Sequence, residues 1–385
     1  MRTYFTFLLF CVIPASIWAT HNRAGEITYE QIDAMMIRAT ITTYSQTSSV
    51  QADRDSLRIC WGDGICEMLS RTNGDGDPQE NDYKINTYVG THAYAEMGTY
   101  SISMTDPNRN AAILNVNAPN SVQIQFHLQS SVTLMEMAAD QPNRSPTLLV
   151  PPIDVGFVRQ RFMHAPSAID LDGDSIAYEL VTPLMENDMP VPNYMQVDEI
   201  GAGDDNSYSF DEETGLFIWN SPQIVGQYNI AIKIKAFRNG ELVDMLIRDM
   251  QILIQPEENI PPHIGILKTT AGPCSIRVKA GQSAEVLFSL IDEEDGQTAD
   301  VPKLEVFSEI GEKSVLVESQ VFSELSGTFA WTPTEADVRN RPYYVTIKAT
   351  DSKGGATFEV VAIEVLPLSS AVSDNFKAAG YELFP

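Results

Sequence analysis

Three aspartates, Asp170, Asp172 and Asp174, alternate with a leucine and a glycine in the stretch Asp-Leu-Asp-Gly-Asp. Carboxylates spaced so closely around a glycine turn can converge on one hard cation, and Ca²⁺ takes about six to eight oxygen ligands. The stretch is not an EF-hand loop, because no glutamate stands where the twelfth loop position requires one. Asp-Gly sequences are also common in solvated turns. A Ca²⁺ site and an ordinary turn therefore both remain open.

Two cysteines, Cys60 and Cys66, flank the sequence Trp-Gly-Asp-Gly-Ile. A thioredoxin-type redox site needs two residues between its cysteines and a metal site needs further ligands, so neither pattern is present. If 62–64 form a three-residue hairpin loop, the two cysteines lie opposite each other on neighbouring strands, close to bonding distance. We predict an architectural disulfide, with two free thiols as the alternative. Cys274 is left over, and we expect it to be buried or unpaired.

Catalytic patterns are missing from the sequence. The five histidines are single and scattered, without a metal-binding spacing such as His-Glu-x-x-His. There is no Gly-x-Ser-x-Gly elbow, phosphate-binding glycine loop or dinucleotide fingerprint. Adjacent acids such as Asp204-Asp205 are expected on the surface of an acidic chain and do not establish the carboxylate pair of a glycosidase. We predict that the protein is not an enzyme.

Three tryptophans, Trp61, Trp219 and Trp331, could form a row that stacks on sugars. Two of them alternate with an apolar neighbour, Ile59 with Trp61 and Phe217 with Trp219, in the register of a strand with one buried face. A β-sandwich core commonly buries a tryptophan. We therefore expect these side chains to pack in cores.

Charge limits the possible partners. Lys and Arg number 25 against 52 Asp and Glu, which gives a formal net charge of −27. Such a chain repels the phosphates of nucleic acids and anionic lipid surfaces, so we exclude nucleic acid as a partner. The acidity fits either solubility outside the cell or capture of divalent cations, and composition does not separate the two.

The N-terminus has the features of a signal peptide. Residues 1–19 contain Arg2, an apolar run over 5–13 and a small residue, Ala19, at the expected cleavage point. The apolar run is too short to span a bilayer, and no later segment is long enough to do so. We expect a secreted protein, extracellular or on the outer cell surface, where disulfides persist.

The elements that must position these residues are strands. Short alternating or β-branched runs, such as 36–44, 121–126 and 228–234, are separated by clusters of Gly, Asp, Asn and Pro. Convincing helical periodicity over a dozen residues is absent. The predicted fold class is all-β.

An internal repeat divides the second half of the chain. The pattern Gly-x-Phe-x-Trp occurs at 215–219 and at 327–331, each time followed by a proline and then by an alternating strand headed by Tyr228 or Tyr343. The copies are about 110 residues long, the size of an immunoglobulin-like sandwich. Tyr100 heads a similar strand earlier in the chain. We expect these tyrosines to bury their rings and to hydrogen-bond the backbone, as in a tyrosine corner.

The segment before the repeats resembles a polycystic-kidney-disease (PKD) domain, an extracellular β-sandwich. The resemblance rests on Trp61-Gly-Asp-Gly64, Thr91-His-Ala-Tyr94, Gly98-Thr-Tyr100 and Asp106, in that order. Many members of the family have two more residues before the Gly-Asp-Gly, so this chain departs from the pattern there. Within this resemblance, His92 is expected to be structural.

The two later repeats resemble cadherin-like and immunoglobulin-like domains of bacterial surface proteins, through the stretches 170–174, 209–215 and 349–355. The opening residues 20–27 and the three-part order are similar to secreted Bacteroidota proteins associated with gliding motility and type IX secretion. The expected fold is a tandem array of PKD-like and immunoglobulin-like β-sandwiches. The expected parts are a signal peptide (1–19), a PKD-like sandwich (20–140), two immunoglobulin- or cadherin-like sandwiches (141–257 and 258–367) and a tail (368–385).

The tail resembles the segment that leads into a type IX sorting domain. Such a sorting domain opens with a motif like Tyr-Pro-Asn-Pro. The chain ends at Tyr381-Glu-Leu-Phe-Pro385 instead. A complete chain would then be exported without this anchor, and a truncated one would favour attachment to the cell surface.

The cadherin-like resemblance implies Ca²⁺ as a cofactor. Such domains combine an aspartate turn with an aspartate at the end of the tyrosine-headed strand. The second repeat offers Asp351 for that role and a turn with Asp292 and Asp295, whereas the first has Ala236 where Asp351 aligns. The implied metal ligands are Asp170, Asp172, Asp174, Asp292, Asp295 and Asp351.

Three functions fit this pattern. The leading hypothesis is a non-enzymatic extracellular adhesion or interaction protein with three sandwiches in line, stiffened by Ca²⁺ and binding a protein or glycan at the cell surface. The second is a passive stalk that displays a missing C-terminal module. The third is an accessory carbohydrate-binding protein, which requires an exposed aromatic platform. The ligand, the domain orientation and the oligomeric state are left open.

Overall fold

The computed structural model describes residues 22–49, 53–79, 82–135, 143–153, 155–256, 258–268, 275–294, 297–298, 301–321 and 324–369. Helices in these residues are 3-10 helices of three residues each, namely η2 (Ser121–Gln123), η3 (Val197–Glu199), η4 (Gly311–Lys313) and η5 (Glu335–Asp337). Strands make up the rest of the regular structure, so the all-β fold class is confirmed. The predicted signal peptide, residues 370–385 of the tail, Cys274 and Asp295 lie outside the described residues.

The N-terminal unit contains β1 (Asn22–Asp33), β2 (Met36–Gln46), β3 (Ser56–Cys60), β4 (Cys66–Ser70), β5 (Asp77–Gln79), β6 (Tyr83–Ala93), β7 (Thr99–Asp106) and β8 (Phe126–Thr133). In β2, Ile37, Ala39 and Ile41 are buried and their neighbours less so. Because successive side chains of a strand face opposite sides of the sheet, such residues meet in one core, together with Trp61 and Tyr88.

The central unit contains β9 (Thr147–Leu148), β10 (Val155–Phe157), β11 (Phe162–His164), β12 (Ala168–Ile169), β13 (Ser175–Val181), β14 (Leu184–Met185), β15 (Met189–Pro190), β16 (Ser207–Phe210), β17 (Phe217–Asn220), β18 (Gly226–Arg238) and β19 (Glu241–Gln255). A two-residue loop, Asn239-Gly240, joins β18 to β19. Its φ angles of 54° and 86° are both positive, as a type I′ turn requires.

The C-terminal unit contains β20 (His263–Lys268), β21 (Ser275–Lys279), β22 (Ala284–Ile291), β23 (Glu293–Glu294), β24 (Gln297–Thr298), β25 (Lys303–Ser308), β26 (Ser314–Val321), β27 (Glu324–Trp331), β28 (Tyr343–Thr350) and β29 (Ala356–Leu366). Its two four-stranded sheets have the orders β20-β22-β27-β26 and β21-β29-β28-β25. Phe288, Trp331 and Ile347 belong to the core that these strands share.

One sheet joins the N-terminal and central units. Along one edge, β19 pairs with β18; along the other, it meets β8, β1 and β10 in turn. Gly25 of β1 lies opposite Asp249 of β19, where a Cβ atom would come within 2.8 Å of the Leu128 side chain and 2.9 Å of the Thr42 carbonyl oxygen. Glycine is required at this close approach, because any side chain would displace a neighbouring strand.

Tyrosine corners occur in all three units, as predicted, although only the Tyr228 ring is fully buried, while Tyr100 and Tyr343 are half-buried. The hydroxyl groups of Tyr100, Tyr228 and Tyr343 donate to backbone carbonyl oxygens of Glu96, Ile224 and Asp337, at 2.7, 2.6 and 2.9 Å. The prediction that the tryptophans are core residues is also confirmed, since Trp61 and Trp219 are 0% exposed and Trp331 is 2% exposed.

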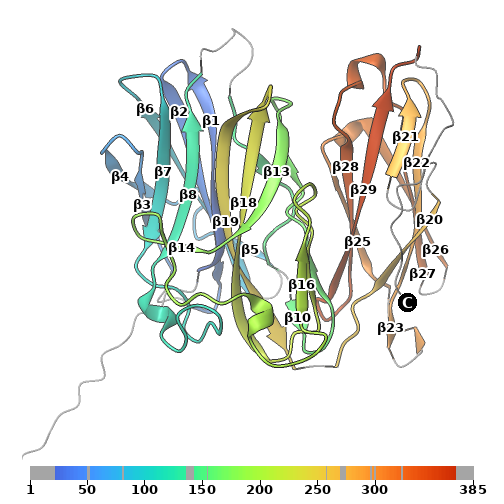
Figure 1. Cartoon of the computed structure of the whole chain (residues 1–385), viewed down its shortest axis with the longest axis horizontal. Coiled ribbons are helices and arrows are strands. Elements are labelled where there is room, and N and C mark those ends of the chain that lie inside the picture. The colour runs from blue at the N-terminus through green and yellow to red at the C-terminus, as the bar shows by residue number, and fades with distance from the viewer. Residues whose placement is uncertain are drawn as a thin grey trace, which may run out of the picture.

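The three units lie side by side, with their strands running across the long axis of the molecule (Figure 1). Apolar contacts join the central and C-terminal units, where Met163 and Ala165 pack in one cluster with Ala356 and Phe358. The in-line arrangement expected from the sequence is therefore wrong, because long-range strand pairing and this lateral cluster turn the units against one another.

Candidate functional site

The side chain of Asp170 stabilises the turn formed by residues 170–174. The Oδ1 atom of Asp170 accepts hydrogen bonds from the backbone N–H groups of Asp172 and Asp174, at 2.9 and 3.0 Å. The carbonyl oxygen of Asp170 accepts a third, from Gly173, whose φ of 86° suits glycine. Asp170 follows β12 and leads into β13, so its side chain shapes the link between these two strands.

The other two aspartates of the turn face arginines. The backbone N–H and the guanidinium of Arg144 donate to Asp172, at 2.6 and 2.9 Å. Arg238 binds Asp174 with a fork of two N–H donors at 2.8 and 2.7 Å. The hydrogen bond from Arg238 to Asp174 raises the pKa of this guanidinium above its ordinary value. Arginine thus holds the carboxylates that the sequence assigned to a metal.

Asp351, in the C-terminal unit, forms the same kind of turn. Its Oδ1 atom accepts the backbone N–H groups of Lys353 and Gly355, at 2.8 and 2.9 Å. Its Oδ2 atom accepts an amide N–H of Asn259, at 2.7 Å, which ties the turn to the segment that enters the unit. Both oxygens of this carboxylate are therefore bound by the protein itself.

The described donors do not fit a Ca²⁺ ion, which needs about six to eight oxygens around one point. Of the four carboxylates above, only the Oδ2 atom of Asp170 is buried without a hydrogen-bond partner, and burial raises the pKa of Asp170 to about 6. Asp292 is 2% exposed at the end of β22. In the residues that the structure describes, no group of three or more Asp, Glu, His or Cys side chains is arranged to hold a metal. The Ca²⁺ binding expected from the sequence, with Asp295 outside these residues, is decided by the following experiment.

We expect calcium to leave the stability of the protein unchanged, because Arg144 and Arg238 already pair with the turn. The measurement is calorimetric unfolding of residues 20–385 in EDTA and in millimolar Ca²⁺. A ligand of the native state at about 100 times its Kd adds about 2.7 kcal/mol, which moves a domain transition by several degrees. A shift of that size, abolished by Asp170→Ala or Asp351→Ala but kept in Asp204→Ala, would establish the metal site instead.

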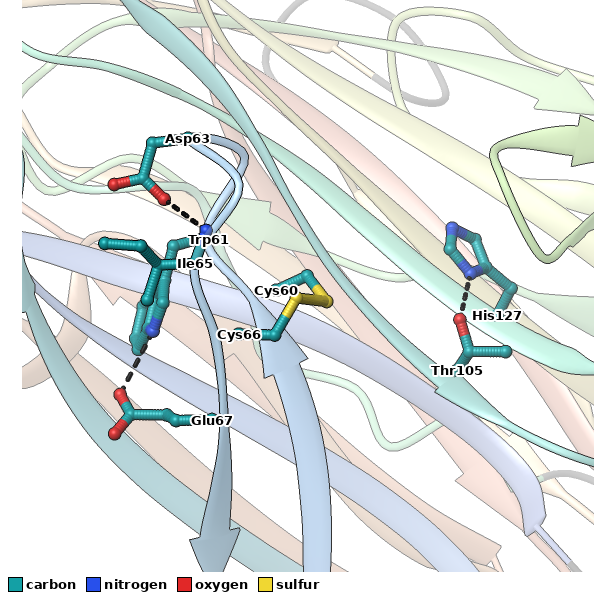
Figure 2. The surroundings of a disulfide bond; sticks show 8 residues. All are labelled: Cys60, Trp61, Asp63, Ile65, Cys66, Glu67, Thr105 and His127. Carbon is teal, nitrogen blue, oxygen red and sulfur yellow. Dashed lines mark hydrogen bonds between the residues drawn. A yellow bond between two sulfur atoms is a disulfide. The ribbon is translucent and has the colours of Figure 1, made fainter.

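The Cys60–Cys66 hairpin is the second candidate site, and it is architectural (Figure 2). A disulfide joins the two cysteines, which are opposed in the register of β3 and β4, with Cα atoms 4.1 Å apart. Trp61 donates its backbone N–H to the Ile65 carbonyl at 2.9 Å and its indole N–H to Glu67 at 3.0 Å. His92 stacks on the Trp61 ring at a centroid distance of 4.9 Å. The turn anchors the core of the N-terminal unit.

Removing this disulfide with Cys60→Ser and Cys66→Ser together is expected to lower the free energy of unfolding by about 2 kcal/mol, the chain-entropy value for so short a loop. Urea unfolding of the double variant measures the loss. Wild-type protein under a reducing agent should show the same loss, and the reduced double variant should show no further change. If the reductant destabilised the wild type and the double variant equally, it would be acting on something other than this disulfide.

A hydroxyl, an imidazole and a carboxylate form a chain that the sequence did not reveal. The His127 Nδ1 atom lies 2.8 Å from Thr105 Oγ1 (Figure 2), and its Nε2 atom lies 2.8 Å from a carboxylate oxygen of Asp188. The order of groups is that of a hydrolytic triad. However, His127 is 3% exposed, so a substrate cannot reach its ring. These three side chains link β7 and β8 to the turn between β14 and β15 of the central unit.

Buried charges on β19 are the largest feature missed from the sequence. Arg248 and Asp249 are both 0% exposed and, as consecutive strand residues, face opposite sides of the sheet. Arg248 pairs with Glu26 at 3.0 Å, and Asp249 pairs with Arg109 at 2.5 Å. Asp244 is 1% exposed, and burial raises its pKa to about 8. The available signal was Asp244, Arg248 and Asp249 in the interior of a strand whose other interior residues, apart from Gln251, are apolar.

Beside the Asp170 turn lies a pocket of about 620 Å³ between the central and C-terminal units. Its walls come from the 172–175 turn, the β18–β19 hairpin and the segment before β28, and they include Asp174, Arg238, Asn239, Arg339, Asn340 and Arg341. A second pocket of about 270 Å³ shares Ser175, Asn340 and Arg341 with the first. Ligand sites often lie in such clefts between domains.

Comparison with known proteins gives distant structural likeness only. No protein-family model and no curated protein matches the chain. Solved structures that resemble it include the N-terminal Ig1-2 module of the Drosophila receptor protein tyrosine phosphatase DLAR, with 14% identity over 57% of this chain and 98% of that one, at a TM-score of 0.22. Cadherin domains 1–4 of protocadherin gamma B7 give 14% identity, 87% and 72% coverage and a TM-score of 0.20. Domains 4 and 5 of the S-layer protein SbsC have 11% identity over 71% of this chain and 98% of that one, at a TM-score of 0.20.

These TM-scores are too low to carry a functional argument, and the fold assignment rests on the strands and their pairing. In the part of the chain that the structure describes, we find no helix with the length and apolar character of a membrane span.

Proposed function

We propose that this chain is a non-enzymatic interaction protein of the extracellular space or outer cell surface, which binds a protein or glycan partner. The observation that carries the proposal is the way the three β-units are fastened into one body. A shared sheet with buried ion pairs joins the first two units, and an apolar cluster joins the third. Such a body holds its loops and clefts in fixed relative positions, which lowers the entropic cost of binding a partner.

The disulfide supports the proposed location, since Cys60–Cys66 persists in oxidising compartments. From the sequence resemblance we add a finer proposal, a Bacteroidota protein exported by the type IX system and associated with gliding motility. Fractionation of producing cells, with and without external protease, tests this location. Protein found outside the cell or on its surface supports it, and protein protected in every fraction contradicts it.

The adhesion proposal is tested with the purified, labelled chain on whole cells and on immobilised glycans. We expect saturable binding that unlabelled chain competes away. A passive stalk, the main alternative, gives no saturable binding on any surface. The buried tryptophans argue against a sugar platform made of Trp61, Trp219 and Trp331, so a glycan partner needs another site on the molecule.

A further inference from the structure

The last strand of one sheet in the C-terminal unit leaves an edge without a partner. In the order β20-β22-β27-β26, β26 pairs with β27 along its full length. Among the described strands, none pairs with the other edge of β26. This sheet lies on the side of the C-terminal unit that faces away from the central unit (Figure 1). A second polypeptide can therefore reach the edge.

The side chains of β26 are apolar for a strand so exposed. Val315 and Val317 are each 60% exposed, and Val321 is 61% exposed. Because they alternate along the strand, these three residues share one face. The register with β27 places that face on the outer side of the sheet, since Leu316, on the other face, lies opposite the core residue Phe329. Even Leu316 is 39% exposed.

The usual protection of an edge strand is missing from β26. Exposed edges commonly carry a lysine, a proline or a β-bulge, each of which discourages pairing with another chain. The sequence Ser-Val-Leu-Val-Glu-Ser-Gln-Val contains neither of these residues, and the register with β27 runs without a shift. The outer edge therefore offers backbone N–H and C=O groups flanked by β-branched side chains, which are the features that a strand added to a sheet uses.

The charges on this sheet indicate which strand fits. Strands β22, β27 and β26 carry the acids Glu285, Glu324 and Glu318 and contain no lysine or arginine. Lys313, which directly precedes β26, is already bonded to Asp337 at 2.9 Å. Opposite charges on facing residues of two strands stabilise the pair, and like charges destabilise it. The edge therefore favours a basic strand.

We propose that β26 binds an extended segment of another protein, which adds a fifth strand to this sheet and places a lysine or arginine opposite Glu318. The inference rests on the proposed function and names the class of partner. Backbone hydrogen bonds along the edge provide affinity, and side chains that pack beside Val315 and Val317 provide specificity. A second copy of this chain fits less well, because each copy has a net charge of −27 and presents another acidic strand.

The test is titration calorimetry of the folded chain with an acetylated and amidated peptide. The peptide alternates threonine and valine over the length of β26, with a lysine at its centre and one beyond each end for solubility. We expect saturable one-to-one binding. Replacing the central lysine with glutamate should weaken binding about threefold to tenfold, because a like-charged pair takes the place of a favourable one. Methylating the backbone nitrogens that face β26 should abolish binding, because it removes the donors of the added strand.

Two variants of the chain locate the binding edge. Val317→Lys places a charge in the middle of β26 and should weaken binding about tenfold or more. Leu267→Lys is the matched control, because it puts the same charge on β20, the opposite edge of the same sheet, at a residue that is 58% exposed. It should leave binding unchanged. Both positions are exposed, so we expect both variants to fold, and thermal unfolding verifies this.

Three results would overturn the proposal: no binding of the lysine peptide, equal binding of the methylated peptide, or an unchanged affinity in Val317→Lys. Light scattering of the free chain tests the second copy as the occupant. A dimer that Val317→Lys converts to a monomer would mean that β26 pairs with itself, which would also overturn the assignment to another protein.

The cell-binding assay separates this inference from the proposed function. If Val317→Lys binds cells as the wild type does, the interaction function stands and β26 is not its site. If the wild-type chain binds no cell or glycan surface, the interaction function itself fails.

Discussion

Replacing Arg109 with methionine is expected to lower the free energy of unfolding by about 3–5 kcal/mol, the cost of leaving a buried charge without its partner. Arg109 is 0% exposed and donates to both carboxylate oxygens of Asp249, at 2.9 and 2.5 Å. It also donates to the carbonyl oxygen of Leu184 at 2.8 Å. The substitution keeps much of the side-chain volume but leaves Asp249 as a buried charge without its partner inside the shared sheet.

Urea unfolding at neutral pH measures this loss. Arg38→Met is the matched control, because Arg38 pairs with Glu30 at 3.4 Å on the exposed surface of the same sheet, and exposed pairs contribute about 0–1 kcal/mol. Adding Asp249→Asn to Arg109→Met should recover part of the lost stability, since the unpaired buried charge is then removed. A double variant as unstable as the sum of the two single variants would mean that packing, and not the unpaired charge, causes the effect.

The location of this pair explains its importance. Arg109 comes from the loop after β7 of the N-terminal unit, and Asp249 lies on β19, opposite Gly25. The same point of the sheet carries the Arg248–Glu26 pair on its other face. Two buried ion pairs therefore flank the junction of the first two units. A buried pair fixes one arrangement of its partners because any other arrangement exposes an unpaired charge to a medium of low polarity.

Local features of the fold were predictable from the sequence because neighbouring residues determine them. The all-β class follows from alternating strands and turn residues, and Asn239-Gly240 forms the tight hairpin loop that such a dipeptide favours. The tyrosine corners were predictable for the same reason. The hydroxyl of Tyr228, for example, reaches the backbone only four residues upstream.

The shared sheet was not predictable, because its pairing is between residues far apart in the chain. Gly25 and Asp249 are opposite each other, yet the sequence of neither strand specifies that the two strands pair. Alternation specifies which face of a strand is buried, and it does not specify which strand lies alongside. The in-line arrangement followed from treating each repeat as an independent sandwich.

The aspartate turn was located from the sequence, but its chemistry was not. The spacing of Asp170, Asp172 and Asp174 places their carboxylates close together in either interpretation. What decides between them is the position of Arg144, before β9, and Arg238, at the end of β18. Neither arginine adjoins the turn in sequence, so only the folded structure shows that guanidinium groups face these acids.

Asp244 is expected to make the stability of the protein depend on pH. It is buried on β19, where it accepts a hydrogen bond from the Tyr29 hydroxyl and lies 3.2 Å from the Asn143 amide. Arg238 donates to the oxygen of that same amide. No cation in the described contacts touches the carboxylate directly, so burial dominates and raises the pKa of Asp244 to about 8.

The sign follows from the two pKa values. In the unfolded chain the carboxyl loses its proton near pH 4, and in the folded chain near pH 8. Between these limits the folded state binds more protons, so the free energy of unfolding falls as pH rises, by up to about 1.4 kcal/mol per pH unit. Below about pH 4 both states are protonated and the dependence from this group ends.

Asp244→Asn removes the titrating group and keeps an amide able to bond Tyr29 and Asn143, so the variant should be more stable than the wild type at pH 8 and should lose most of the slope. Urea unfolding between pH 5 and pH 8.5 measures both effects. Asp204→Asn, in an exposed turn, should keep the wild-type slope. Burial of Asp170 adds a slope of the same sign over a narrower range, between about pH 4 and pH 6, which Asp244→Asn should leave in place. Parallel curves for wild type and Asp244→Asn would show that Asp244 is ionised throughout, and the junction would then hold a buried negative charge stabilised by Tyr29 and Asn143.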